Sequence, residues 1–368
     1  MLQDVQFALP HPESTATFPT PNVQDDVQSG LNSLSVLELF ESPRFNRRFK
    51  YYPPGEITPT IIGFAECGDP DGTAMIMIPD HGCVRHHAAL YHAEAWSLHI
   101  RMIWMERPGY GQAEPQPIHE GTVLQWSGQI ADSLKIERLG LTGFGVGAVY
   151  ALAIAHKIPY RLHSPIYLIS PWVSTKITNK YQWTNWVPKQ FMVLSLNVYF
   201  GTRRLCRKSK ALGILNELKQ KLSGAINSKD SEQHVGLAAL ATVDREDGHL
   251  VTMDKSEDSD NSTALLEATR TLLVRQHSLR QPSTGGMVSD ILVALEKSYS
   301  FGYDYSRVSL PIRIFSGSMD NDVEKFGVSW MQDNIDKCDV KMFEGKGRSV
   351  HASVVKDLFE DYIRELRK

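Results

Sequence analysis

Apolar and polar residues alternate along the chain in two periods, which predict short buried strands interleaved with amphipathic helices. Short apolar runs between turn residues indicate strands, whereas apolar positions three or four residues apart indicate helices. The strands predicted this way cover residues 60–68, 74–78, 101–105, 138–142 and 165–170. Because strands that alternate with helices pack as a mostly parallel, doubly wound sheet, we expect an α/β fold with its site at the carboxyl ends of the strands.

The same patterns divide the chain into four segments. We expect a partly flexible N-terminal extension over 1–45, a first core part over 46–171, a helical cap insertion over 172–305 and a second core part over 306–368. Within the insertion the spacing predicts helices over 187–212, 215–223, 262–279 and 287–299, and a loose polar loop over 245–261; a C-terminal helix is predicted over 352–367.

Composition and charge exclude several classes of protein. The net charge is −3, with no basic stripe of the kind that nucleic-acid binding needs. No apolar run approaches about 18 residues, so we expect no membrane span. The N-terminus shows no basic and apolar leader, and the four cysteines have no paired spacing, which together predict a reducing, cytoplasmic setting. No glycine loop fits a phosphate, so no organic cofactor is expected.

A glycine-rich turn lies between a predicted strand and a predicted helix. Its sequence is Gly143-Phe144-Gly145-Val146-Gly147, and the helix begins after it at Ala148. Strand, tight turn and helix are the context of a G-x-S-x-G nucleophile elbow, in which the central side chain points into an active site. Here the central residue is Gly145, which has no side chain to offer.

Four motifs in order resemble those of the α/β-hydrolase superfamily. Residues 74–82 resemble the strand and His-Gly turn beside an oxyanion hole, and residues 106–111 (Glu-Arg-Pro-Gly-Tyr-Gly) resemble its D-R-P-G-Y-G turn. Residues 317–323 resemble the turn that bears the acid, and residues 344–349 the turn that bears the histidine. The resemblance covers about residues 60–171 and 306–368. In its general character the sequence is similar to capped proteins of fungal type in this superfamily, some of which act in secondary-metabolite pathways.

Two of the three triad positions depart from that resemblance. Gly145 stands where the serine is expected and Arg348 where the histidine is expected, so only Asp320 is of the expected type. A Ser-His-Asp device needs a hydroxyl, a base and an orienting acid, so conventional serine hydrolysis is not expected. His351 is a candidate substitute base if it reaches the site; alternatively it begins the C-terminal helix.

The resemblance implies that the backbone oxyanion hole outlasts the lost side chains. Its donors would be the N–H groups of Val146 and Cys83, which would stabilise an oxyanion or an enolate. The Cys83 thiol is either a substitute nucleophile or a small apolar filler. Further candidates for a substrate pocket are His81, His86, Phe144, Trp172 and Trp183.

Several of those candidates have a plainer interpretation. Tryptophans at the start of the insertion commonly pack on one another and on the body of the protein rather than lining a pocket. The polar residues Asp80, His81, Arg85, His86, His87 and His92 crowd together, but their spacing fits no closed zinc pattern, so no metal is expected.

Three classes of function remain open. The first is a non-hydrolytic enzyme that activates an apolar, carbonyl-containing small molecule for cyclisation, condensation or isomerisation. The second is a pseudoenzyme that binds a ligand or serves as a scaffold. The third is a hydrolase that uses water activated by His351 or Asp320. The sequence names neither the substrate nor the oligomeric state.

Overall fold

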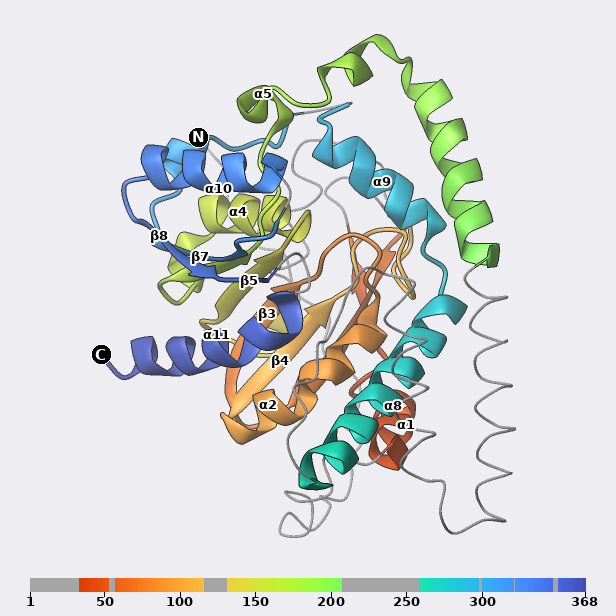
Figure 1. Ribbon diagram of the computed structural model, residues 1–368, viewed down its shortest axis with the longest axis vertical. Coiled ribbons are helices and arrows are strands. Elements are labelled where there is room, and N and C mark those ends of the chain that lie inside the picture. Colours follow the sequence, from red (N-terminus) through yellow and green to blue (C-terminus); the bar gives the residue numbers. More distant parts are fainter. Residues whose placement is uncertain are drawn as a thin grey trace, which may run out of the picture.

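The computed structural model describes residues 33–52, 57–115, 131–206, 258–297, 300–320, 322–346 and 350–368. Its centre is one eight-stranded sheet with the strand order β1-β2-β4-β3-β5-β6-β7-β8. β2 pairs antiparallel with β1 and with β4, and every other pairing is parallel. The mostly parallel sheet predicted from the sequence is therefore confirmed (Figure 1). The strands are β1 (Arg47–Tyr51), β2 (Thr60–Gly68), β3 (Thr73–Ile78), β4 (Ile100–Met105), β5 (Gly140–Phe144), β6 (Ile166–Ile169), β7 (Ile312–Gly317) and β8 (Cys338–Phe343).

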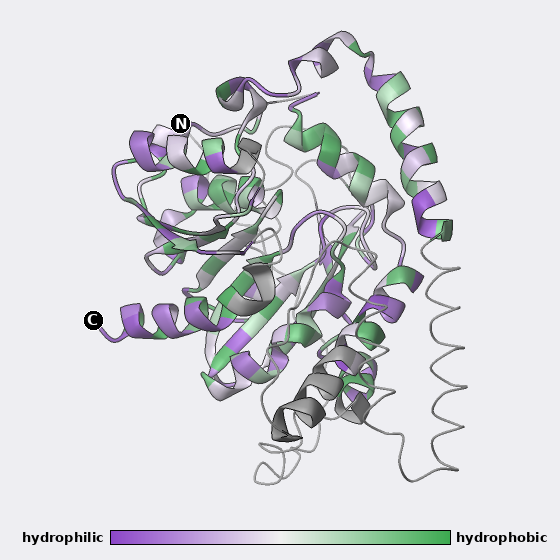
Figure 2. Cartoon of the chain, in the orientation of Figure 1, coloured by the Kyte–Doolittle hydropathy of each residue, from purple (hydrophilic) through white to green (hydrophobic). Residues whose placement is uncertain are grey.

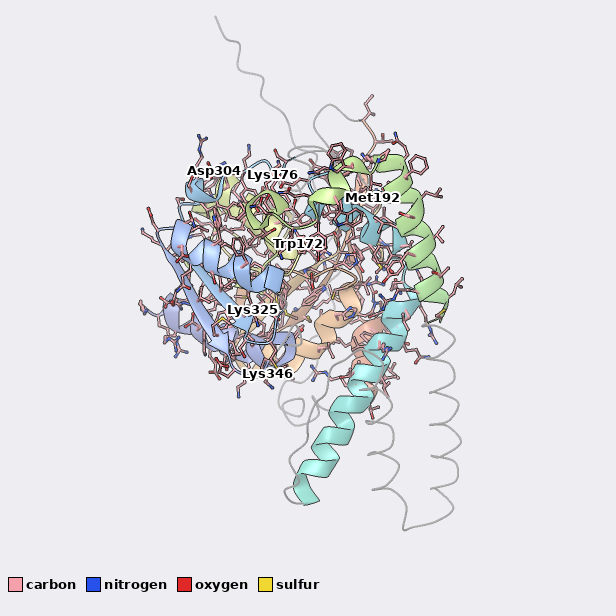
Figure 3. All side chains as sticks on the ribbon, turned by 45° about the horizontal axis from the view of Figure 1, so that its top comes forward. Trp172, Lys176, Met192, Asp304, Lys325 and Lys346 are labelled. Carbon is pink, nitrogen blue, oxygen red and sulfur yellow. The ribbon has the colours of Figure 1, made fainter. Side chains whose placement is uncertain are left out.

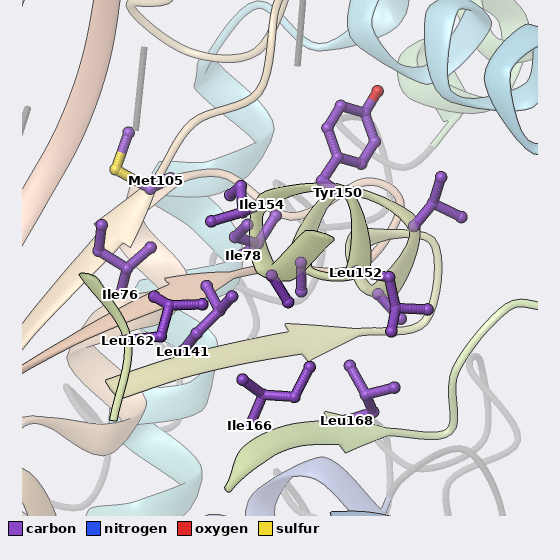
Figure 4. Close-up of a cluster of buried hydrophobic side chains, with 14 of the residues drawn as sticks. Ile76, Ile78, Met105, Leu141, Tyr150, Leu152, Ile154, Leu162, Ile166 and Leu168 are labelled. Carbon is purple, nitrogen blue, oxygen red and sulfur yellow. The ribbon is translucent and has the colours of Figure 1, made fainter. Parts of the chain in front are cut away.

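Alternate residues of the central strands enter two separate cores, one on each face of the sheet. Along β3, Ile76 and Ile78 enter one core, while Met75 and Met77 enter the other. This alternation is the two-residue period of a strand that is covered on both sides. Figure 4 shows the first core, in which strand residues such as Leu141 and Leu168 gather beneath the helix that carries Tyr150.

Helices cover both faces. α4 (Gly147–Lys157) and α10 (Asp322–Asn334) contribute to the core of Ile76 and Ile78. On the other face lie α1 (Ser33–Glu41), the 3-10 helix η1 (Arg85–Tyr91), α2 (His92–Ser97) and α11 (Val350–Leu366). Nine of the eleven residues of α4 are buried. That burial is why the first turn of α4, which follows Gly145, is held firmly in place.

The chain between β6 and β7, which includes the insertion expected from the sequence, is largely helical in its described residues. It contains α5 (Thr175–Thr178), η3 (Gln182–Trp186), a helix over 189–206, α8 (Asp258–Arg280), α9 (Thr284–Ala294) and η4 (Tyr305–Arg307). The helix over 189–206 packs on α9, whereas α8 lies along η1 and α1 (Figure 1). Only part of the insertion therefore lies near the carboxyl ends of the strands.

Two of the predicted boundaries in the insertion are wrong. α9 ends at Ala294 rather than near 299, because Glu296 adopts a φ of 48°, which a helix cannot continue. α8 begins at Asp258, inside the segment predicted as a loop. The helix predicted over 215–223 lies outside the described residues. Among the helices that the structure describes, none is long and apolar enough to cross a membrane.

Candidate functional site

The glycine turn after β5 has the backbone of a nucleophile elbow. Gly145 has a φ of +48°, in the left-handed region that such a turn requires. Its N–H donates to the Ile169 carbonyl at 2.9 Å, and its own carbonyl accepts the Trp172 N–H at 2.9 Å. A Cβ at Gly147 would lie 2.2 Å from the Ile78 carbonyl oxygen, so the turn sits tightly against β3. The turn therefore has the tight backbone conformation that the motif predicts.

The carboxylate of Asp80 occupies the space above Gly145. A Cβ built on Gly145 would lie 2.0 Å from Asp80 Oδ1, far inside van der Waals contact. The same oxygen accepts the Val146 N–H at 2.9 Å. Asp80 is half-buried and follows the end of β3 by two residues. A carboxylate from the neighbouring strand thus stands where the serine side chain of an elbow would project.

Both N–H groups nominated for the oxyanion hole are engaged, and both bond to Asp80. Val146 donates to the carboxylate, and Cys83 donates to the Asp80 carbonyl at 3.1 Å, which closes a tight turn. The N-terminus of α4 favours negative charge at this point, so it stabilises the Asp80 carboxylate. An incoming oxyanion would have to replace these acceptors. The oxyanion hole expected from the sequence at Val146 and Cys83 stays a prediction.

A buried arginine fixes the backbone of this loop. Arg107 follows β4, is fully buried, and donates to the carbonyls of Pro79 and of Asp80, the latter at 3.1 Å. It also forms a two-pronged ion pair with Asp290 of α9, with Nε to Oδ1 at 3.0 Å and Nη2 to Oδ2 at 2.5 Å. Arg107 therefore links the loop that carries Asp80 to the helical insertion.

Asp290 collects further donors from the core. Tyr110 Oη donates to Asp290 Oδ2 at 2.6 Å and in turn accepts the Gly82 N–H at 3.1 Å. His81 Nδ1 lies 3.5 Å from the same oxygen, at the long limit of a hydrogen bond. Burial alone would raise the pKa of Asp290, but the charge and hydrogen bonds of Arg107, with the contact of His81, lower that pKa to about 2. Burial, followed by the charge of Asp290, raises the pKa of Tyr110 well above its usual range.

Asp320 lies in the turn after β7, as the resemblance implies. Its Oδ2 accepts hydrogen bonds from Ser170 Oγ at 2.7 Å, Ser316 Oγ at 3.0 Å and the Gly317 N–H at 3.1 Å. Its Oδ1 is buried and has no hydrogen-bond partner among the described residues. Arg348 and the side chain of His351 lie outside the described residues, so their reach toward Asp320 stays a prediction.

Two of the other predicted site residues have side chains directed elsewhere. His86 is buried in an aromatic cluster with Phe40, Phe45 and His277. Burial, with a smaller contribution from Arg85, lowers the His86 pKa to about 3. Phe144 packs against Trp104 in the core beneath the sheet.

The two tryptophans of the insertion differ from each other. Trp172 donates its indole N–H to the Ala294 carbonyl at 2.9 Å, and its backbone contacts Gly145, so it joins the elbow to the insertion. It lies where the chain leaves the sheet for the insertion (Figure 3). Trp183 is 65% exposed on the surface. The structure therefore brings together Asp80, His81, Cys83, Val146 and Trp172, and leaves Trp183 outside that group.

Asp80 is part of the site, although the sequence pattern predicts it only as a member of the polar cluster around the His-Gly turn. The other polar residues of that cluster point in different directions. For example, His92 Nδ1 accepts the Gly68 N–H at 3.0 Å. Among the residues that the structure describes, no three potential metal ligands lie close enough to hold an ion. Two features of the sequence together could have indicated Asp80. It directly precedes the His-Gly turn, and Gly145 stands at the position where the motif has its nucleophile.

Comparisons with known proteins establish the fold. No family model and no curated protein matches this chain. A carboxylesterase structure from the thaumarchaeon Nitrososphaera gargenis is 14% identical, with a TM-score of 0.51 over 87% of this chain and 98% of its own. A hydrolase from Pseudomonas aeruginosa is 11% identical, with a TM-score of 0.51 over 87% and 98% of the two chains. The 2-hydroxy-6-oxo-6-phenylhexa-2,4-dienoate hydrolase of a Rhodococcus strain is 12% identical, with a TM-score of 0.51 over 88% and 98%. With the strand order, these likenesses show an α/β-hydrolase fold.

Proposed function

We propose that this protein is an α/β-hydrolase-fold enzyme that activates a carbonyl compound without forming an acyl-enzyme, with Asp80 as its acid–base group. One observation carries the proposal: the Asp80 carboxylate fills the nucleophile position and accepts the Val146 N–H at 2.9 Å. A serine at this elbow would require the Asp80 carboxylate to move. The elbow presents instead a fixed carboxylate beside a backbone donor at a helix N-terminus.

This pair of groups suits proton transfer next to a carbonyl. Asp80 removes a proton from the carbon beside the carbonyl, the C–H electron pair moves into the new C–C double bond, and the carbonyl oxygen becomes an enolate oxygen. The protonated Asp80 is then a weaker acceptor for the Val146 N–H, because it has lost its charge. The Val146 N–H can then donate to the enolate oxygen instead of to Asp80. It becomes available as negative charge develops on that oxygen.

The enolate can proceed in two ways that conserve all atoms. If a double bond is conjugated with the enolate, the γ-carbon can take the proton back from Asp80, which is a double-bond isomerisation. Alternatively the α-carbon attacks a second carbonyl, whose oxygen takes the proton from Asp80, which is an aldol addition between two molecules or an aldol cyclisation within one. Neither path needs an organic cofactor. An apolar substrate and a role in secondary-metabolite biosynthesis are parts of this proposal.

A second candidate function is a pseudoenzyme that binds a ligand or acts as a scaffold. One observation favours it: the N–H groups of Val146 and Cys83 already donate to Asp80. The positive N-terminus of α4 is therefore balanced without a substrate. A third candidate, hydrolysis by activated water, rests on Asp320, whose Oδ1 is buried and has no described partner.

Deuterium incorporation separates the enzyme from the pseudoenzyme. Extract from a strain of the source organism that lacks this protein is incubated with the purified chain in D2O and compared by mass spectrometry. We expect one metabolite to be converted, with deuterium appearing at the carbon beside its carbonyl. Asp80→Asn should lower the rate at least about 100-fold, which is the usual contribution of a positioned base.

The matched control is Asp71→Asn, the same change on an exposed turn residue between β2 and β3. It should leave conversion at the wild-type rate. No conversion by the wild-type protein, or equal rates for Asp80→Asn and wild type, would show that Asp80 is not a catalytic base. A water-derived addition of mass 18 that persists in Asp80→Asn and disappears in Asp320→Asn would favour hydrolysis instead.

A further inference from the structure

The helix over 189–206 has an apolar stripe on each of two opposite faces. On one face Met192 and Phe200 are buried against Val288 and Leu292 of α9. The other face carries exposed apolar residues. At about 100° per residue, these lie within roughly 60° of one another and opposite the packed stripe. They are Phe191 (67% exposed), Leu194 (63%), Val198 (59%) and Leu205 (69%).

Two tryptophans extend this apolar face. Trp183 and Trp186 belong to η3, directly before the helix, and are 65% and 89% exposed. The helix runs along the outer edge of the molecule, with α9 between it and the sheet (Figure 1), and apolar and polar residues alternate along it (Figure 2). Exposed apolar patches of this kind commonly mark interaction surfaces. We call this surface the outer cap face.

The charge of the segment that carries the outer cap face is of one sign. Residues 171–206 contain five Lys and Arg residues and not a single Asp or Glu, in a chain whose net charge is −3. Lys176 pairs with Glu296, and Arg204 donates to backbone carbonyls. Lys180, Lys189 and Arg203 are exposed, although the same spacing places Lys189 and Arg203 on the side of the helix that faces α9. The segment therefore combines exposed tryptophan and aliphatic side chains with an excess of positive charge around them.

We propose that the outer cap face docks on the surface of an anionic lipid bilayer. A helix that lies in a membrane interface presents Trp, Phe and Leu to the acyl boundary and Lys or Arg to the headgroups. Each basic residue near such a surface adds to the attraction, which salt weakens. The proposal does not depend on the chemistry at Asp80. A bilayer bound to the outer cap face would, however, be a source of apolar substrate close to the insertion.

Co-flotation with vesicles tests the proposal. The full chain is mixed with vesicles of phosphatidylcholine alone, or of phosphatidylcholine with phosphatidylserine, and floated on a density gradient. We expect flotation with the anionic vesicles, a blue shift of tryptophan fluorescence, and loss of binding at high salt. The combined variant Trp186→Ser, Phe191→Ser and Leu194→Ser should lower the bound fraction at least about tenfold. The variant Lys180→Glu with Lys189→Glu should lower it on anionic vesicles.

The matched control is Tyr160→Ser, which removes another exposed aromatic residue (72%) after α4 and away from the outer cap face. It should float like the wild type. The changed residues are exposed, so circular dichroism should show an unaltered fold for every variant. Absence of flotation, or equal loss in Tyr160→Ser, would overturn the proposal. A third result would also overturn it: the wild type does not bind vesicles but self-associates with increasing concentration, and the triple variant does not self-associate. The occupant of the outer cap face would then be a second copy of the chain.

Discussion

The Asp80 carboxylate occupies the space that a side chain at Gly145 would need: a Cβ at position 145 would lie 2.0 Å from Asp80 Oδ1. The two residues come from the ends of neighbouring parallel strands, β3 and β5. The glycine at position 145 and the aspartate at position 80 are therefore structurally coupled. Restoring the serine alone should not restore a hydrolase.

Gly145→Ser should lower the free energy of unfolding by about 1–3 kcal/mol, because the new side chain meets Asp80 and the φ of residue 145 is positive. Adding Asp80→Ala should recover part of that loss. In a double-mutant cycle measured by chemical denaturation, we expect a coupling of about 1 kcal/mol or more. Strictly additive effects would show that the two positions do not compete for space.

A fluorophosphonate probe should label neither the wild type nor Gly145→Ser. The wild type has no hydroxyl at the elbow, and the serine variant has Asp80 over it. Labelling is read by mass spectrometry of the intact protein, with an ordinary serine esterase as the positive control. Rapid labelling of the wild type would mean that another residue is the nucleophile.

Asp290→Ala should destabilise the protein by about 3–5 kcal/mol, because it leaves the Arg107 guanidinium buried without its counter-charge. The double variant Arg107→Met with Asp290→Leu should be less destabilised than Asp290→Ala, since no unpaired charge remains. Unfolding in urea measures both. The free energy of unfolding lost in the double variant could instead equal the sum of the losses from replacing each residue alone. The ion pair would then not couple the insertion to the core.

His86 should make the stability depend on pH. Its folded pKa is about 3 because of burial, whereas an unfolded histidine has its ordinary value of about 6.5. The unfolded state therefore binds more protons below pH 6.5, so stability falls as the pH drops from about 6.5 toward 3. Between pH 7.5 and pH 5 this residue should account for a loss of about 2 kcal/mol.

The variant His86→Leu tests this dependence, because leucine is of similar size and does not titrate. Its free energy of unfolding should decrease less than that of the wild type between pH 7.5 and pH 5. His87 and His277, whose pKa values burial also lowers, keep part of the dependence in both proteins. Parallel curves for the two proteins would indicate that His86 is protonated in the folded state.

Asp320→Asn should keep the fold and lower turnover less than about tenfold, if Asp80 is the base. The amide oxygen can still accept from Ser170 and Ser316 at the position of Oδ2. Asp320→Ala should instead cost about 1–3 kcal/mol of stability, because buried donors lose their acceptor. Loss of turnover in Asp320→Asn as large as in Asp80→Asn would make Asp320 part of the chemistry.

Much of the sheet follows from local patterns. The run predicted over 101–105 is β4, and the run predicted over 74–78 is β3 within one residue. The glycine turn also lies where its motif places it, because its flanking glycines permit the close approach of α4 to β3. Periodicity was less successful at the end of α9. There a single residue with positive φ, Glu296, overrides an apolar pattern that continues beyond it.

By itself, the sequence determined the order of strands and helices, the glycine turn at Gly145 and the place of Asp320 after β7, because these depend on local spacing and turn chemistry. Only the tertiary structure decided what fills the site. Asp80 and Val146 are 66 residues apart, and Arg107 and Asp290 are 183 apart. A pattern shows which face of an element is buried, but the partner of a buried polar group depends on how distant segments pack.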